Sequence, residues 1–171
     1  MGLLRGLLAS DHRQTLDFFI VGLCDVSEPS VDRQELLYNA SVLAHYAQVS
    51  TQAHSEIPAP ESLSTVFDHF VFDSSLRLDG PMMETAGSQC LLLAGFFEEQ
   101  MRRRHNIRWY AQLGTSFFTR AAAQENSSPK ARLLRSIARG FEGWRQRHER
   151  LSRELRDRQY LLTLPKPEPL R

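Results

Sequence analysis

Arginine is the residue whose number and spacing in this sequence most suggest chemistry. Nineteen of the 21 basic residues are arginines, and nine of these lie between residues 132 and 158. Guanidinium groups bind carboxylates and phosphates through paired hydrogen bonds, and such binding weakens as salt rises. A second cluster surrounds a short break in an apolar stretch and consists of Arg102, Arg103, Arg104 and Arg108. We take these four as candidate binding residues for an acidic surface or for nucleic acid.

The two halves of the chain carry opposite charges. Residues 1–100 hold 4 bases and 14 acids, a net of −10, and residues 101–171 hold 17 bases and 6 acids, a net of +11. One interpretation is that the two halves pack together in one domain and neutralise each other. The other is that the basic half stays exposed for an acidic partner or a polyphosphate.

Residues that hold metals or perform catalysis form no recognisable pattern here. No two of the six histidines are spaced i,i+4, and two cysteines alone cannot complete a zinc cluster. Neighbouring carboxylates Glu98 and Glu99 point about 100° apart on a helix, so they cannot share one site. Each stands four residues before an arginine, which is the spacing of an ordinary helical ion pair. We therefore predict no enzyme, no metal and no cofactor.

Apolar residues recur at helical spacing in every long segment, which predicts an all-α protein of five or six helices. Helices are expected over residues 11–25, 30–48 and 61–71. Asn39 falls beside the apolar stripe of the second helix, so we expect it to be buried and hydrogen-bonded at a helix contact. The length suits a single domain over residues 1–164, followed by a mobile, proline-rich tail at 165–171.

Residues 84–123 are expected to form two helices joined by a tight corner at His105-Asn106. Their aromatic side chains are Phe96, Phe97, Trp109, Tyr110, Phe117 and Phe118. The interpretation that we favour is that these rings form the core. The alternative is an apolar groove for a partner's helix or for a small hydrophobic ligand.

The same stretch contains a characteristic series of elements. They are Gly87, an apolar run at residues 90–93, the step Ala94-Gly95-Phe96-Phe97, the three arginines at 102–104, the pairs Trp109-Tyr110 and Leu113-Gly114, and Phe118. The series resembles a family of uncharacterised bacterial all-helical proteins. Three positions depart from the family pattern: Ser88 and Arg108 stand where an acid is usual, and Glu98 where proline is usual. Because that family has no established activity, the resemblance implies a fold and supplies no site.

A long basic C-terminal helix is expected over residues 129–162. Its apolar positions alternate in steps of three and four residues, the heptad seam of a helix packed on another helix, and they are Leu134, Ile137, Phe141, Trp144, His148, Leu151 and Leu155. Such a helix is about 50 Å long and exceeds the roughly 30 Å width of a domain this size, so its far end should overhang.

We therefore predict that the first three seam residues are core and that Trp144, His148, Leu151 and Leu155 contact a partner. His148 would make this contact pH-sensitive, because a protonated imidazole is disfavoured in an apolar seam. Gly140 and Gly143 are expected to weaken the helix and to permit close approach of another backbone.

These observations favour a non-enzymatic helical interaction module, an adaptor or assembly factor that binds another protein or a second copy. One alternative is a nucleic-acid-associated or regulatory protein that uses the arginine-rich half, and another is a carrier of a small hydrophobic ligand between helices. No run approaches the roughly 20 apolar residues of a membrane span, so we expect a cytoplasmic protein. Cys24 and Cys90 both lie in apolar segments and are expected to be buried free thiols.

Overall fold

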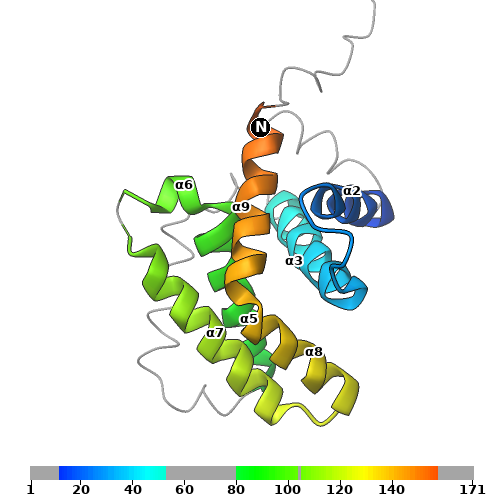
Figure 1. The fold of residues 1–171 in the computed structure, drawn as a ribbon, viewed down its shortest axis with the longest axis vertical. Helices are drawn as coiled ribbons and strands as arrows, with labels where there is room; N and C mark the ends of the chain where they lie inside the picture. Colours follow the sequence, from blue (N-terminus) through cyan, green and yellow to red (C-terminus); the bar gives the residue numbers. More distant parts are fainter. Residues whose placement is uncertain (1–11, 53–79, 104, 158–171) are drawn as a thin grey trace, which may run out of the picture.

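The computed structural model describes residues 12–52, 80–103 and 105–157, and within these ranges every regular element is a helix (Figure 1). The prediction of an all-α fold is therefore confirmed. The elements are α2 (His12–Asp25), α3 (Arg33–Gln52), α5 (Gly80–Leu91), the π-helical η2 (Leu92–Phe96), α6 (Glu98–Met101), α7 (Ile107–Gln124), α8 (Ser128–Arg139) and α9 (Phe141–Asp157). The described residues contain seven α-helical segments, so the expected count of five or six is not confirmed. The helix predicted at 61–71 and the tail predicted at 165–171 lie outside the described residues.

Short polar side chains cap the N-termini of α3 and α7. Asp32 precedes α3, and its Oδ1 accepts hydrogen bonds from the backbone N–H groups of Gln34 and Glu35, at 2.9 and 3.0 Å. Asn106 caps α7 in the same way and accepts from the N–H of Trp109 at 3.3 Å. These caps satisfy N–H groups that have no partner inside the helix. The corner expected at His105-Asn106 is thus present and has a local cause.

The helix before that corner contains a feature that its sequence did not reveal. At residues 92–96 the backbone widens into a π-helix, closed by a hydrogen bond from the N–H of Phe97 to the carbonyl of Leu92 at 2.9 Å. One extra residue in a turn changes which carbonyls keep an intrahelical partner. Leu92, Leu93, Ala94 and Gly95 are all buried at this point. The widened turn therefore lies in the interior and contacts α9.

The single long C-terminal helix is the main error of the sequence prediction. Its residues form two helices that meet at Gly140, and Figure 1 shows α8 and α9 pointing in different directions. Gly140 has φ −93° and ψ 15°, outside the helical region, so the helical path is interrupted at this residue. The bend turns α9 back into the domain, which removes the overhang that a straight helix would have had.

The core lies around α9. Figure 1 shows α9 between α2 and α3 on one side and α5 and α7 on the other, and α9 contacts α2, α5, α7 and η2. The largest fully buried side chains include Trp144, Phe118 and Phe141. Leu134 and Ile137 are also buried, so the expected core positions of the seam are confirmed.

The aromatic side chains expected in the core are mostly there. Phe97, Tyr110, Phe117 and Phe118 are buried, and Phe96 is half-buried against the core cluster. Trp109 differs, because it is 40% exposed.

Candidate binding groove

The partner contact predicted on the far half of the seam is not supported by burial. Trp144, His148 and Leu151 are 2%, 0% and 2% exposed, and Leu155 is half-buried against the core. They are buried because the bend at Gly140 directs α9 between the other helices. A partner could reach the first three only if α9 left the domain, so we correct their assignment from binding residues to core residues.

A buried polar network joins α9 to α3. Trp144 Nε1 donates to Glu35 Oε1 at 3.2 Å, and His148 Nε2 lies 2.8 Å from Asn39 Oδ1. The Asn39 amide nitrogen donates to the Glu35 carbonyl at 2.8 Å, so Asn39 Oδ1 is the acceptor and His148 Nε2 carries the hydrogen. The buried, hydrogen-bonded Asn39 that the sequence predicted is confirmed, and its partner is the histidine assigned to a partner surface.

His148 is neutral in this environment. Burial lowers its pKa from 6.5 to about 3, because a charged imidazole is poorly solvated in the core. The other ring nitrogen, Nδ1, has no hydrogen-bond partner among the described residues. The imidazole therefore acts as a fixed donor that sets the register between α3 and α9.

Close backbone contact joins α9 to the π-helix. A Cβ added at Gly95 would lie 2.8 Å from His148 Cβ and 2.9 Å from the backbone oxygen of Arg145, so only glycine fits. Gly114 of α7 has the same role opposite Phe141, whose ring would lie 2.3 Å from an added Cβ. The close approaches expected at Gly140 and Gly143 thus occur at glycines of the facing helices.

Arg145 connects α9 to the widened turn. Its Nη1 donates to the carbonyl oxygen of Ala94 at 3.2 Å and lies 3.4 Å from a carboxylate oxygen of Glu98. Its Nε and Nη2 donate to both carboxylate oxygens of Glu142, at 2.9 and 2.6 Å. This hydrogen bonding lowers the pKa of Glu142. Arg145 and Glu142 therefore largely neutralise each other.

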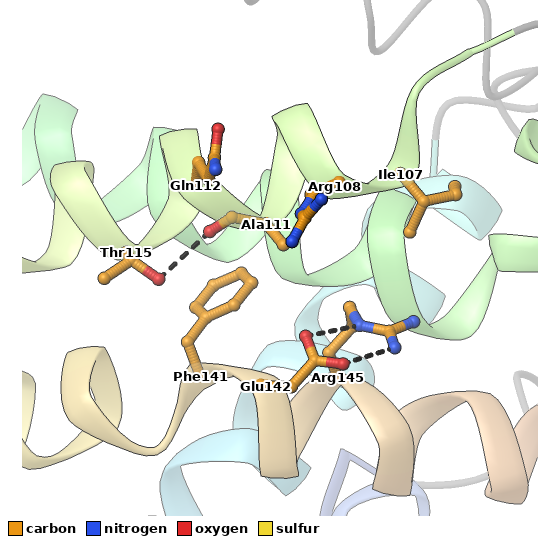
Figure 2. A pocket seen from close by; sticks show the side chains of 8 residues that line it. All are labelled: Ile107, Arg108, Ala111, Gln112, Thr115, Phe141, Glu142 and Arg145. Carbon is orange, nitrogen blue, oxygen red and sulfur yellow. Dashed lines mark hydrogen bonds and ion pairs between the residues drawn. The ribbon is translucent and has the colours of Figure 1, made fainter.

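A groove of about 630 Å³ opens between α7 and α9 (Figure 2). Its lining residues are Ile107, Arg108, Ala111, Gln112, Thr115, Phe141, Glu142 and Arg145. Figure 2 shows Arg108 reaching into the groove from α7 and Phe141 pointing toward α7 from the opposite helix. The Thr115 hydroxyl donates to the carbonyl of Ala111 at 3.0 Å. The groove thus combines an apolar floor with a charged rim.

Two arginines line this groove, and Arg108 is the one without a carboxylate partner among the described residues. It is exposed, and within the ranges that the structure describes no carboxylate pairs with it. Because Arg145 and Glu142 are paired with each other, the groove can offer Arg108 to an incoming anion. Bidentate hydrogen bonding to a carboxylate is the interaction that a guanidinium makes best.

The other corner arginines have different surroundings. Arg102 donates to Glu98 at 2.8 Å, which confirms one of the two predicted i,i+4 ion pairs. Glu99 pairs with Arg156 of α9. Arg103 is exposed, and Arg104 lies outside the described residues. Of the four corner arginines, Arg108 is therefore the one that the structure places in a groove.

Sequence reasoning identified Arg108 but missed the groove and its opposite wall. Nothing in the sequence distinguishes Glu142 and Gln112 from other polar residues at the solvent-facing positions of a helix. Gly114 was a usable signal, because a glycine within a helix marks a close contact with a neighbouring element. In the structure that neighbour is Phe141, which forms the floor of the groove.

One of the two cysteines differs from the prediction of buried free thiols. Both are free, but Cys24 is exposed and only Cys90 is buried, where desolvation raises the pKa of its thiol.

Over the described ranges, no three histidine, cysteine or acidic side chains gather closely enough to hold a metal ion. None of the described helices combines the length and the apolar character needed to cross a bilayer.

Comparisons with protein-family models, with curated proteins and with solved structures find no match to this chain. The resemblance to bacterial helical proteins therefore stays an interpretation of the residues that carry it, and the groove must be understood from its own chemistry.

Proposed function

We propose that the protein is a non-enzymatic helical interaction module that binds another protein in the groove between α7 and α9. The observation that carries this proposal is the exposed Arg108, with no carboxylate partner in the described part of the chain, beside the apolar side chains of Ile107, Ala111 and Phe141. A ligand that pairs with Arg108 and also packs on the apolar side chains must carry a carboxylate next to an apolar group. A peptide segment with Asp or Glu beside a Leu, Ile or Phe has this chemistry.

The packing of the groove supports a binding role over a catalytic one. Its strongest polar pair, Arg145 with Glu142, is occupied by internal hydrogen bonds that hold α9 to the π-helix. The Thr115 hydroxyl is likewise held by a backbone carbonyl. Groups that are already hydrogen-bonded can shape a surface, but they are poorly placed to exchange protons with a substrate.

A second candidate is a small-molecule carrier, because the groove volume falls within the range of roughly 300–1,000 Å³ typical of ligand sites. The rim argues for a polar ligand, since Arg108, Glu142 and Arg145 all line the groove. A purely hydrophobic ligand would have to cover these charges, and that desolvation is costly. We therefore favour the carboxylate-bearing peptide.

The test is selection from a library of random peptides displayed on phage, followed by affinity measurement with purified variants. We expect selected peptides to contain an acidic residue beside an apolar one. Arg108→Glu should weaken their binding at least tenfold, which is about 1.4 kcal/mol. Arg120→Glu is the matched control, because Arg120 is an exposed arginine about 18 Å further along α7.

Chemical-shift mapping with a selected peptide locates the site. Binding that shifts Gln112 and Thr115 and depends on Arg108 supports the proposal. Peptides that bind equally well to the Arg108→Glu and Arg120→Glu variants would contradict it. If peptides fail and only small apolar probes shift the groove residues, the carrier function replaces the adaptor function.

A further inference from the structure

The outer face of α8 carries only positive charge. This helix holds Lys130, Arg132, Arg135 and Arg139 and no acidic residue. Its inner face packs in the core through Ala131, Leu134, Ile137 and Ala138. We call Arg132, Arg135 and Arg139 the arginine stripe. At 100° and 1.5 Å per residue, these three exposed residues fall within an arc of about 60° and span about 10 Å of the helix.

The arginine stripe lacks counterions in the part of the chain that the structure describes. Lys130, on the same helix, pairs with Glu84 at 3.0 Å and with Glu125 at 3.7 Å. No such carboxylate pairs with the three stripe arginines among the described residues. The stripe is therefore a solvated positive patch, open to an acidic partner.

The C-terminal part of the outer face of α2 has the opposite character. Asp17, Val21 and Asp25 follow at i, i+4 and i+8, and all three are exposed. Exposed Arg13 lies one turn before Asp17, so the acidic part of this face begins at Asp17. Val21 is 60% exposed, the highest value among the large hydrophobic residues of the described ranges. The two carboxylates are about 12 Å apart along the axis, and no base pairs with them among the described residues. Across residues 12–52 there are two bases and five acids, a net of −3.

We propose that the arginine stripe of one copy binds the acidic face of α2 on a second copy of this chain. The two faces match in length, about 10 Å for Arg132 to Arg139 and about 12 Å for Asp17 to Asp25. Arg135 then lies over Val21, which its aliphatic stem can cover. Since every copy carries both faces, the contact joins molecules either reciprocally in a dimer or head to tail in a chain.

A second copy explains the two faces better than nucleic acid does. Single-stranded nucleic acid is held by basic grooves combined with aromatic side chains on which bases stack. α8 contains no aromatic residue, and its bases form one short stripe. Nucleic acid would also leave the complementary acidic face of α2 without a role. The ion pairs of the proposed contact are solvent-exposed, so association should be weak and should weaken further with salt.

The test is sedimentation velocity at about 50 mM and about 500 mM salt, where screening lengths differ by roughly threefold. We expect concentration-dependent association at low salt and monomers at high salt. The double variants Arg132→Glu/Arg139→Glu and Asp17→Lys/Asp25→Lys should each weaken association at least about tenfold. The chain that carries all four changes should associate again, to within about threefold of the wild type, because the charges are exchanged rather than removed.

Arg103→Glu is the matched control, because Arg103 is exposed and follows α6, which Figure 1 shows on the opposite side of the molecule from α8. Circular dichroism checks folding, and the milder pair Arg132→Gln/Arg139→Gln replaces any variant that does not fold. A wild type that stays monomeric at about 1 mM and low salt would overturn the proposal, because even weak contacts are populated there. So would failure of the four-change chain to associate. If the stripe variants lose binding to an oligonucleotide while self-association is unchanged, the stripe is a nucleic-acid site and the proposal is wrong.

Discussion

α8 and α9 follow each other in the chain and are both rich in arginine, yet their arginines have different surroundings. In α8, Arg132, Arg135 and Arg139 have no carboxylate partner among the described residues. In α9 each arginine has a defined contact: Arg145 with Ala94, Glu98 and Glu142; Arg147 over the Trp144 ring at 4.5 Å; Arg150 with the Val26 carbonyl; Arg153 with Glu149; and Arg156 with Glu99.

The cause is the position of each helix relative to the core. α9 lies between other helices, so Arg145, Arg150 and Arg156 reach carbonyls and carboxylates outside α9. Arg147 and Arg153 instead contact residues of α9 itself. α8 packs through one face only, and its opposite face has no neighbour to supply an acid in the described structure. Arginine content alone therefore does not identify a binding surface. Packing separates arginines that hold the fold together from arginines that are open to a partner.

The largest expected effect tests whether α9 belongs to the core. Trp144 is 2% exposed and Trp109 is 40% exposed, so the two tryptophans form a matched pair. Trp144→Ala should lower the free energy of unfolding by about 3–5 kcal/mol, because it leaves a cavity and an unpaired Glu35. Trp109→Ala should cost about 1 kcal/mol or less. Urea unfolding measures both, and a loss for Trp144→Ala as small as about 1 kcal/mol would place α9 outside the core.

The next effect tests the contact between α9 and the π-helix. Gly95→Ala places a methyl group against His148 Cβ and the Arg145 carbonyl, so we expect a loss of about 1–3 kcal/mol. Gly143→Ala is the control, since this glycine is exposed and its nearest neighbour is a flexible arginine tip at 3.5 Å. There alanine should stabilise the helix by about 1 kcal/mol. If both variants gain stability, the close contact of α9 with η2 is wrong.

A third comparison separates the two classes of arginine directly. Arg145→Ala should lower the free energy of unfolding by about 1–3 kcal/mol, because the Ala94 carbonyl and Glu98 lose a charged partner. Arg135→Ala on α8 should change it by less than about 0.5 kcal/mol. Thermal and urea unfolding of both variants provide the measurement. A loss for Arg135→Ala as large as that for Arg145→Ala would remove the distinction between α8 and α9.

The fourth effect concerns pH and accumulates gradually over a range of pH. The pKa of His148 is lowered from 6.5 to about 3 in the folded state. Between these two pH values the imidazole is protonated in the unfolded chain and neutral in the folded chain. This contribution to stability is fully present above pH 6.5 and decreases as pH falls toward 3, by at most about 1.4 kcal/mol per pH unit.

The range from pH 6.5 to about 5 is the most informative, because carboxylates titrate below it. His148→Gln removes the titration and should flatten the dependence of stability on pH in this range. An unchanged slope in the variant would show that His148 is not the group responsible.

Much of the fold followed from periodicity, because apolar residues at helical spacing must face a core. This rule correctly placed Asn39 at a helix contact and Leu134, Ile137 and Phe141 inside. It failed at Gly140, because the heptad pattern continues across the bend and the pattern alone cannot show whether a glycine is used as a hinge. The π-helix at 92–96 was also missed, since its stabilising partner, Arg145, is about fifty residues away in the sequence.

The candidate site was less accessible to sequence reasoning. Arg108 was identified by its charge. Its suitability as a binding residue depends on the neighbouring Phe141 and on the neutralisation of Glu142 by Arg145, and only the packing reveals these two features. His148 shows the reverse error. Its position on the apolar seam was predicted correctly. Its role as a partner contact was wrong, because that role assumed one straight C-terminal helix whose far end extends beyond the domain.

The central claim is that the arginines of α9 are fixed by contacts within the protein, whereas Arg132, Arg135 and Arg139 of α8 have no carboxylate partner in the described part of the chain. Nuclear magnetic resonance of the arginine Nε–H groups tests it most directly, through the heteronuclear relaxation of each side chain in the monomer at high salt. The account predicts an ordered, slowly exchanging Nε–H for Arg145 and mobile, rapidly exchanging groups for Arg132, Arg135 and Arg139. Equally ordered groups in both helices would contradict it.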